Sequence, residues 1–160
     1  MEIKDIIISS IFVYFLITIS VTDIRIGLIR NNILLPMAVI ALILDLSNQL
    51  ITIDEAIIAA FIGGLFFYII MILSRGGLGG GDVKFAFVLG LWLGFDGILA
   101  TILTSLIFAS AVGIVISIKR KNLKTSIPFG PFISLGALSV FFFKSQFLEL
   151  YENCLKIIYN

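Results

Sequence analysis

Long apolar runs separated by short polar segments form the dominant pattern of this chain. A helix that crosses a bilayer needs about 17–25 mainly apolar residues. Four of six runs reach that length; the second does so only if it continues past Asp45, and the fourth is short, with Lys84 at its edge. The pattern predicts an all-α fold, a polytopic membrane helix bundle of about six transmembrane helices within residues 1–143. The runs cover residues 6–22, 31–44, 56–74, 83–95, 97–118 and 125–143.

The composition argues against a soluble globular domain. Of the 160 residues, 60% are hydrophobic and 13% are charged, and the mean hydropathy is +1.19, whereas soluble domains carry about 25% charged residues. The net charge of +1 indicates no nucleic-acid partner. The partner that this composition requires is the lipid bilayer. The apolar start of the chain lacks a small-residue cleavage pattern, so we expect it to be a retained helix.

Basic residues are concentrated in every second polar segment. Segments 23–32, 75–84 and 119–124 hold eight of the eleven Lys and Arg residues. Because basic segments tend to stay in the cytoplasm, the pattern predicts a multi-pass topology with both termini outside. The remaining basic residues would lie on the outer side, and they are Lys4, Lys144 and Lys156.

Residues 144–160 are too polar to span a membrane and form a separate C-terminal tail. Apolar residues recur there at helical spacing, which predicts an amphipathic helix on the outer surface. Membrane attachment is a simpler role for this tail than partner binding. The apolar positions are Phe147, Tyr151, Cys154 and Ile158.

The chain contains no histidine and a single cysteine, Cys154. This composition removes Ser-His-Asp and Cys-His catalysis, histidine-bound metals and cysteine-rich zinc sites. We therefore expect no metal and no cofactor. If the chain is a hydrolase, its proton chemistry must come from Asp, Glu, Lys or Tyr.

Two of the ten acidic residues stand apart from the others. Seven lie in predicted outer ends, loops or the tail, where a solvated carboxylate needs no explanation, and Asp45 is expected at the outer end of its helix. Asp23 and Asp82 remain, both at the predicted cytoplasmic boundary. The other seven are Glu2, Asp5, Asp54, Glu55, Asp96, Glu149 and Glu152.

Asp82 follows a segment with five glycines in six positions. Glycine permits φ > 0 and the close approach of another chain, so Gly79, Gly80 and Gly81 are candidate substrate-binding residues. A flexible loop with Asp82 as the helix N-cap explains the pattern equally well. A phosphate-binding loop fits poorly, because no Gly-Lys-Ser/Thr follows and Asp82 would repel a phosphate.

Asp23 ends the first apolar run, where the helix dipole disfavours a carboxylate and a charge at membrane depth is costly. Either it lies among lipid headgroups and pairs with Arg25, or it faces the bundle interior and meets Asp82. In the second case, two carboxylates held close together share one proton. The ionised one can then activate a water for attack on a peptide carbonyl, while the protonated one polarises that carbonyl. An extended substrate could lie along the glycine backbone as an added strand.

Two other functions are consistent with the same sequence. A small membrane transporter or channel subunit would use Asp23 and Asp82 as a proton relay. A non-catalytic assembly subunit would depend on neither carboxylate.

Three segments of the chain resemble type IV prepilin peptidases, in the order found in that family. Residues 79–94 resemble the family's GxGD segment and its continuation, residues 127–132 resemble its IPFGP segment, and residues 21–29 resemble the stretch around its first catalytic aspartate. The resemblance implies a GxGD-type aspartyl protease of the prokaryotic cytoplasmic membrane, with Asp23 and Asp82 as its catalytic residues. Its substrates would be the leader peptides of type IV prepilin or pseudopilin precursors, cut at the cytoplasmic face.

The chain departs from the family pattern at a few places. Longer members carry a cysteine-containing domain associated with N-methylation, which is not found in this sequence, so we expect peptidase activity without methyltransferase activity. Arg30 stands where proline is common, and Phe85 replaces a leucine. Lys84 could favour an ionised Asp82, although an ordinary helix-end lysine is the simpler interpretation. Pro128 and Pro131, in the segment 127–132, suit the first turn of a helix.

Overall fold

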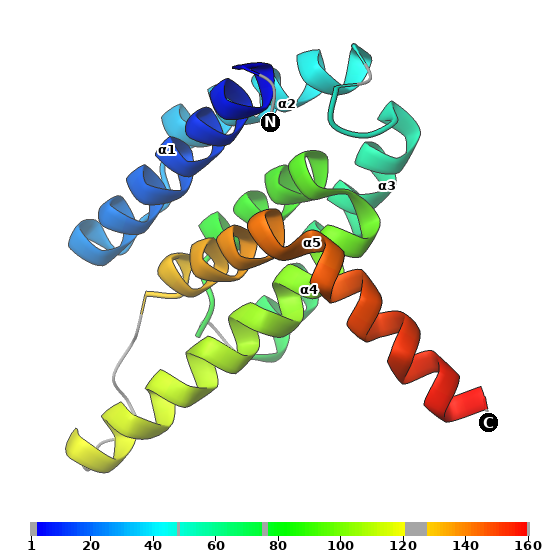
Figure 1. The fold of residues 1–160 in the computed structure, drawn as a ribbon. Coiled ribbons are helices and arrows are strands. Elements are labelled where there is room, and N and C mark those ends of the chain that lie inside the picture. Colours follow the sequence, from blue (N-terminus) through cyan, green and yellow to red (C-terminus); the bar gives the residue numbers. More distant parts are fainter. Residues whose placement is uncertain (1–2, 48, 75–76, 121–127, 160) are drawn as a thin grey trace.

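The computed structural model describes residues 3–47, 49–74, 77–120 and 128–159, and these ranges contain helices and no strand. The all-α fold is therefore confirmed (Figure 1). In chain order the helices are α1 (Ile3–Ile26), α2 (Asn31–Leu46), α3 (Ile53–Leu73), α4 (Gly80–Arg120) and α5 (Gly130–Tyr159).

Two of the helices are kinked, and each predicted apolar run matches one helix or one arm of a helix to within a few residues. α4 is interrupted at Gly94, which has φ 72° and ψ −174°, and α5 is interrupted at Phe143. Among the residues that the structure describes, three helical stretches are long and apolar enough to cross a membrane: Ile3–Ile26, Ile53–Leu73 and Gly80–Val115. α2 and the first arm of α5 are apolar but shorter. These lengths support a membrane bundle, while the count of six spans stays a prediction.

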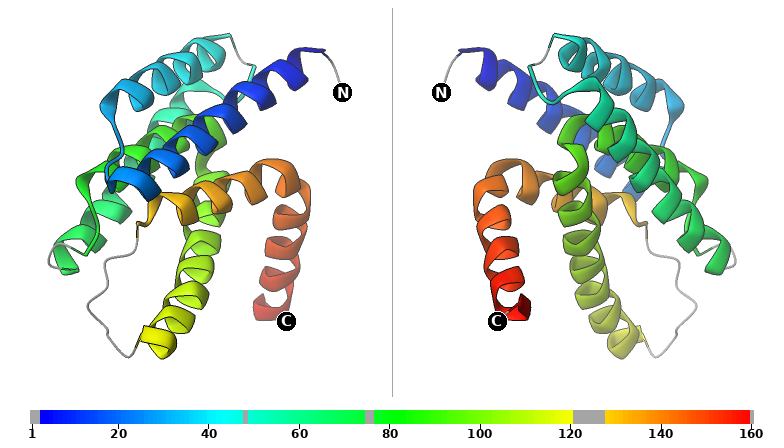
Figure 2. Two further views of the ribbon diagram at one scale, coloured as in Figure 1. Left: turned by 90° about the vertical axis from the view of Figure 1, so that its left-hand side faces the viewer. Right: turned by 90° about the vertical axis from the view of Figure 1, so that its right-hand side faces the viewer.

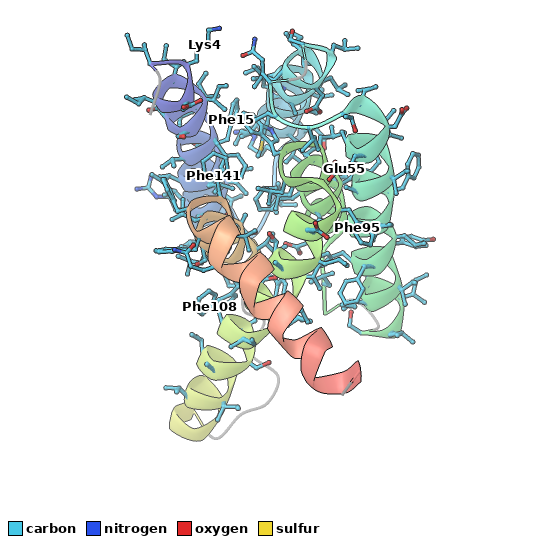
Figure 3. The ribbon with its side chains drawn as sticks, turned by 45° about the vertical axis from the view of Figure 1, so that its right-hand side comes forward. Lys4, Phe15, Glu55, Phe95, Phe108 and Phe141 are labelled. Carbon is cyan, nitrogen blue, oxygen red and sulfur yellow. The ribbon has the colours of Figure 1, made fainter. Side chains whose placement is uncertain are left out.

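The α4 kink depends on a side chain from α3. Glu55 Oε1 accepts a hydrogen bond of 3.3 Å from the backbone N–H of Phe95 (Figure 3). This bond satisfies a donor just after the break at Gly94, where the regular helix ladder is interrupted. Glu55, predicted to be a solvated carboxylate at an outer end or loop, lies half-buried in the first turn of α3 and also has a structural partner.

The core forms where α2, α3 and α5 pack against α4, while α1 packs against α5 and α2 and reaches α4 through its side chains. The most extensive contact joins α3 to α4, and it is so close that a Cβ at Gly90 would lie 2.4 Å from the backbone of Ala60. On α4, Trp92 donates a hydrogen bond of 3.1 Å to the carbonyl of Met37 in α2. Phe12 of α1 stacks near Trp92, with ring centroids 5.0 Å apart. These contacts join α1, α2 and α3 to α4.

The outward faces of the helices are as apolar as the core. Phe61 and Leu65 on α3 are 64% and 59% exposed, and Ile107 on α4 is 65% exposed. Such surfaces would be unfavourable in water and are expected where lipid covers the protein. The arrangement is that of a multi-pass membrane protein.

The second arm of α5 leads away from the other helices (Figure 2). Its backbone is helical as predicted, but most of its side chains, including those of Phe147, Tyr151, Cys154 and Ile158, lie outside the described residues. The amphipathic character of this tail therefore stays a prediction. The two chain ends lie at opposite ends of the molecule in both figures, so the prediction of both termini outside requires this arm to lie along the outer surface.

Candidate active site

Asp23 lies in the last turn of α1 and is buried, with 6% of its surface exposed. Its Oδ2 accepts a hydrogen bond of 2.8 Å from the backbone N–H of Gly130, 107 positions further along the chain. The alternative in which Asp23 pairs with Arg25 is not what the structure has. Two helical positions separate their side chains by about 200° around the axis. Asp23 therefore faces the bundle and Arg25 faces outward.

Gly130, the first residue of α5, can only be glycine if this contact is to be kept. A Cβ at this position would lie 2.7 Å from Oδ2 of Asp23. The start of α5 is fixed by Phe129, whose ring packs 5.9 Å from that of Phe67 on α3. The N-terminus of a helix stabilises a carboxylate. The unfavourable position of Asp23 at the end of α1 is thus compensated by the start of α5.

Asp82 lies in the first turn of α4 and is also buried, with 7% of its surface exposed. Its Oδ2 accepts a hydrogen bond of 3.1 Å from the backbone N–H of Gly79, and its own N–H donates to the carbonyl of Gly79 at 3.1 Å. α4 starts at Gly80, so Asp82 is its third residue and bonds back to the residue before the helix, as in half of a capping box. The interpretation of Asp82 as the N-cap residue itself is therefore wrong.

The two aspartates lie near one another at the same end of the bundle. Their charges interact electrostatically across the gap between α1 and α4. Each has Oδ2 bound to the backbone amide of a glycine. The other oxygen of Asp82, Oδ1, is buried and has no hydrogen-bond partner among the described residues. The site therefore presents a carboxylate oxygen with unused hydrogen-bonding capacity beside a second carboxylate.

The three glycines before Asp82 differ from one another in their surroundings. Gly79 uses its N–H to hold Asp82. Gly80 is exposed, with no atom within 4 Å of where a Cβ would be, whereas a Cβ at Gly81 would lie 2.9 Å from that of Ile29. Part of the glycine bias is thus explained by packing and capping. A role of all three in substrate binding stays a prediction.

Lys84 points toward α2 and makes a contact there. Its Nζ donates a hydrogen bond of 3.2 Å to Oδ1 of Asn31, and its side chain is exposed. This contact favours the interpretation of Lys84 as a helix-end lysine over a role in the ionisation of Asp82. Within the described ranges no three His, Cys, Asp or Glu side chains gather in a way that could hold a metal ion.

Two features of the structure were not predicted from the sequence. Gly130 was part of a segment singled out for its prolines, but the sequence offered no sign that its amide binds Asp23. Asp45 lies at the end of α2 as expected, yet it is 1% exposed, and neither oxygen has a hydrogen bond of good geometry within the part of the chain that the structure describes. Its surroundings include the backbone N–H of Ile51 and the carboxylate of Glu55.

Apolar helices with two buried carboxylates at one end of the bundle define a membrane protein with a paired-aspartate site. The chain belongs to the type IV leader peptidase family, whose sequence profile matches residues 10–118.

Proteins with the name prepilin leader peptidase/N-methyltransferase are similar to most of the chain. The one from Burkholderia pseudomallei is 31% identical over 141 residues, which cover 84% of this chain and 46% of that protein. Those from Bacillus subtilis and Escherichia coli are 28% and 26% identical, over 88% and 81% of this chain and 57% and 60% of their own lengths. The chain thus spans about half the length of these relatives. No solved structure matches it.

Proposed function

We propose that this chain is an aspartic endopeptidase that removes the leader peptide of type IV prepilin or pseudopilin precursors. The observation that carries the proposal is the pairing of Asp23 and Asp82, which are far apart in the sequence, buried, and close enough to interact electrostatically. Membership of the type IV leader peptidase family supports the substrate class. Both residues lie in the region that the family profile matches, residues 10–118.

The two carboxylates would share one proton and exchange roles during the reaction. The ionised carboxylate takes a proton from a water, whose oxygen attacks the carbonyl carbon of the scissile peptide bond. The protonated carboxylate donates a hydrogen bond to the carbonyl oxygen and then passes a proton to the leaving amine. The amides of Gly130 and Gly79 keep the two acids in place, which lowers the cost of reaching the reactive geometry.

The active site would face the cytoplasm, at the inner membrane of a prokaryotic cell. This orientation rests on the basic residues near the paired aspartates, which include Arg25, Arg30 and Lys84. With this orientation the N-terminus would lie outside. The C-terminus also lies outside if the second arm of α5 stays on the outer surface.

We further propose that these 160 residues do not catalyse N-methylation. The matched family segment is that of the peptidase, and the chain spans about half the length of relatives that have both activities in their names. The sequence holds one cysteine, which is too few for the cysteine motif expected of the methylating domain.

Co-expression with a candidate prepilin tests the proposed function. Asp23→Asn and Asp82→Asn should each abolish leader cleavage while the protein still accumulates in the membrane, because each removes one partner of the proton exchange. Asp45→Asn is a matched control, since it also removes a buried carboxylate but lies at the other end of α2.

The size and N-terminal sequence of the prepilin give the result. Cleavage that persists with either active-site variant would exclude that residue from catalysis. Loss of cleavage with Asp45→Asn as well would mean that the loss reflects damage to the fold rather than to the chemistry.

A further inference from the structure

A pocket separate from the paired aspartates lies beside the last turn of α1, on the face that points away from the bundle. It has a volume of about 360 Å³ and is formed where the last turn of α1 and the first turn of α2 meet. The chain reverses between these helices at Gly27, whose N–H bonds to the carbonyl of Asp23 at 2.8 Å and whose φ is 68°. This turn brings Arg25 and Arg30 to the same pocket.

The pocket combines two cations with no acidic residue in its lining. Neither Arg25 nor Arg30 forms an ion pair with any side chain that the structure describes. Asp23 does not neutralise them, because it points into the bundle and binds the amide of Gly130. Two uncompensated guanidinium groups at one pocket attract an anion, and their planar donors suit phosphate oxygens.

The remaining lining divides into a polar and an apolar part. The amide of Asn32 can donate further hydrogen bonds, whereas the hydroxyl of Thr22 already donates to the carbonyl of Thr18 at 2.7 Å. Ile26 and Ile33 line the same pocket, and Ile26 is 58% exposed. A ligand that fills this pocket therefore needs an anionic group beside an apolar one.

The location of the pocket favours a lipid over a soluble anion. It lies at the shared end of two apolar helices, where a transmembrane segment meets the headgroup region. Basic pockets between helices at this level bind anionic lipid headgroups. We infer that the pocket of Arg25 and Arg30 binds the phosphodiester of an anionic phospholipid, with its acyl chains against Ile26 and Ile33.

The inference can be tested on the purified full chain in a neutral detergent. Native mass spectrometry would compare the affinity for phosphatidylglycerol with that for phosphatidylcholine of the same acyl chains. Basic residues near a membrane surface contribute about 1 kcal/mol each to anionic lipid binding, so Arg25→Gln with Arg30→Gln should weaken phosphatidylglycerol binding about 30-fold. Binding of phosphatidylcholine should change little.

A matched control removes two cations elsewhere. Lys4→Gln with Lys84→Gln causes the same change in net charge, but neither residue lines this pocket. It should retain phosphatidylglycerol binding within about threefold of the wild type. An equal loss in both double variants, or no loss with the arginine variant, would overturn the inference.

Two further measurements test the inference even if the glutamine variant folds poorly. Arg25→Lys with Arg30→Lys preserves both charges and should prefer phosphatidylglycerol over phosphatidylcholine, as the wild type does. Wild-type protein that shows no such preference would overturn the inference. Displacement of the lipid by an equal concentration of sn-glycerol 3-phosphate would also overturn it, because it would show a site for soluble phosphate esters.

Discussion

At the level of single residues, both candidate catalytic carboxylates are held by backbone amides of glycine, and no cation among the described residues binds either of them. Asp23 depends on Gly130, and Asp82 depends on Gly79. A hydrogen bond to a charged group contributes about 1.5–3 kcal/mol, which is enough to fix an orientation. A backbone donor carries no formal charge and does not neutralise the acid that it binds, so the two acids remain able to exchange a proton.

Gly130→Ala should therefore slow leader cleavage at least tenfold. The new Cβ would lie 2.7 Å from Oδ2 of Asp23 and force the carboxylate away from its position. A small misplacement of a reacting group can reduce turnover about 100-fold, so kcat should fall more than KM rises. The measurement is a cleavage time course with purified enzyme. Gly113→Ala is the control because nothing lies within 4 Å of its Cβ position, and wild-type kcat in the Gly130 variant would contradict the account.

Asp45 is a buried carboxylate that the proposed reaction does not use. Because neither oxygen has a hydrogen bond of good geometry to a described residue, Asp45→Asn should raise the free energy of unfolding by about 1–3 kcal/mol. The corresponding rise of a few degrees in melting temperature can be followed by differential scanning fluorimetry in detergent. Asp54→Asn, at an exposed position, should leave the melting temperature unchanged. A fall of several degrees for Asp45→Asn would show that its charge has a stabilising partner.

Among single residues, the sequence identified the candidates for chemistry, because few residue types in this chain can transfer a proton. It did not identify contacts between residues of different segments. Asp23 and Asp82 could be selected because they are the two acids at the predicted cytoplasmic boundary of a chain without histidine. The burial of Asp45 and the amide of Gly130 could not be predicted. The amide of Gly130 lies 107 positions from Asp23, and the burial of Asp45 depends on how α2 packs against its neighbours.

At the level of elements, the closest packing in the molecule is between α3 and α4. Gly90 allows the backbones to approach until a Cβ there would lie 2.4 Å from Ala60. Small residues permit this kind of contact between membrane helices. α4 also positions Asp82, so its packing against α3 determines where that carboxylate lies.

Gly90→Val should consequently disrupt the bundle. A branched side chain cannot fit without separating α3 from α4, and overpacking of this kind costs about 1–3 kcal/mol or more. The fraction of protein that elutes as a single species from size-exclusion chromatography after detergent extraction should fall sharply. Gly113→Val tests the same substitution at a position with open space. Equal yields from the two variants would show that the α3–α4 contact is looser than described.

The extents of the helices could be predicted better than their breaks. Apolar runs located every helix, because hydrophobic length is a local property of the sequence. The kink at Gly94 was not predicted, since it involves Glu55 from α3 as the acceptor for Phe95. The number of spans stays a prediction for a similar reason. α2 and the first arm of α5 are short, so whether they span the membrane depends on the helices around them.

At the level of the whole molecule, the apolar exterior, the all-α fold and the paired acids all agree with a membrane protein that has its polar site at one end of the bundle. A bilayer allows water-consuming chemistry only where polar groups gather at a protected end of the bundle. Here the ends of α1, α4 and α5 supply such a place. The family assignment follows from sequence similarity, whereas the assignment of roles rests on this geometry.

The proposal of cleavage without methylation can be checked on the product. Prepilin processed by this chain, in a host with no other N-methylating enzyme, should have an unmodified new N-terminus. Mass spectrometry of the mature terminus gives the answer directly. An added methyl group would contradict the proposal.

The approach of Asp23 to Asp82 is the central claim, and site-directed crosslinking tests it most directly. In a Cys154→Ser background, Asp23→Cys with Asp82→Cys should be joined in high yield by a short thiol-specific crosslinker in membranes. Asp45→Cys with Asp82→Cys is the control, since Asp45 lies 14 positions from the start of α2, about 21 Å along the helix. The account predicts efficient crosslinking of the first pair and little of the second. Equally low yields for both pairs would contradict it.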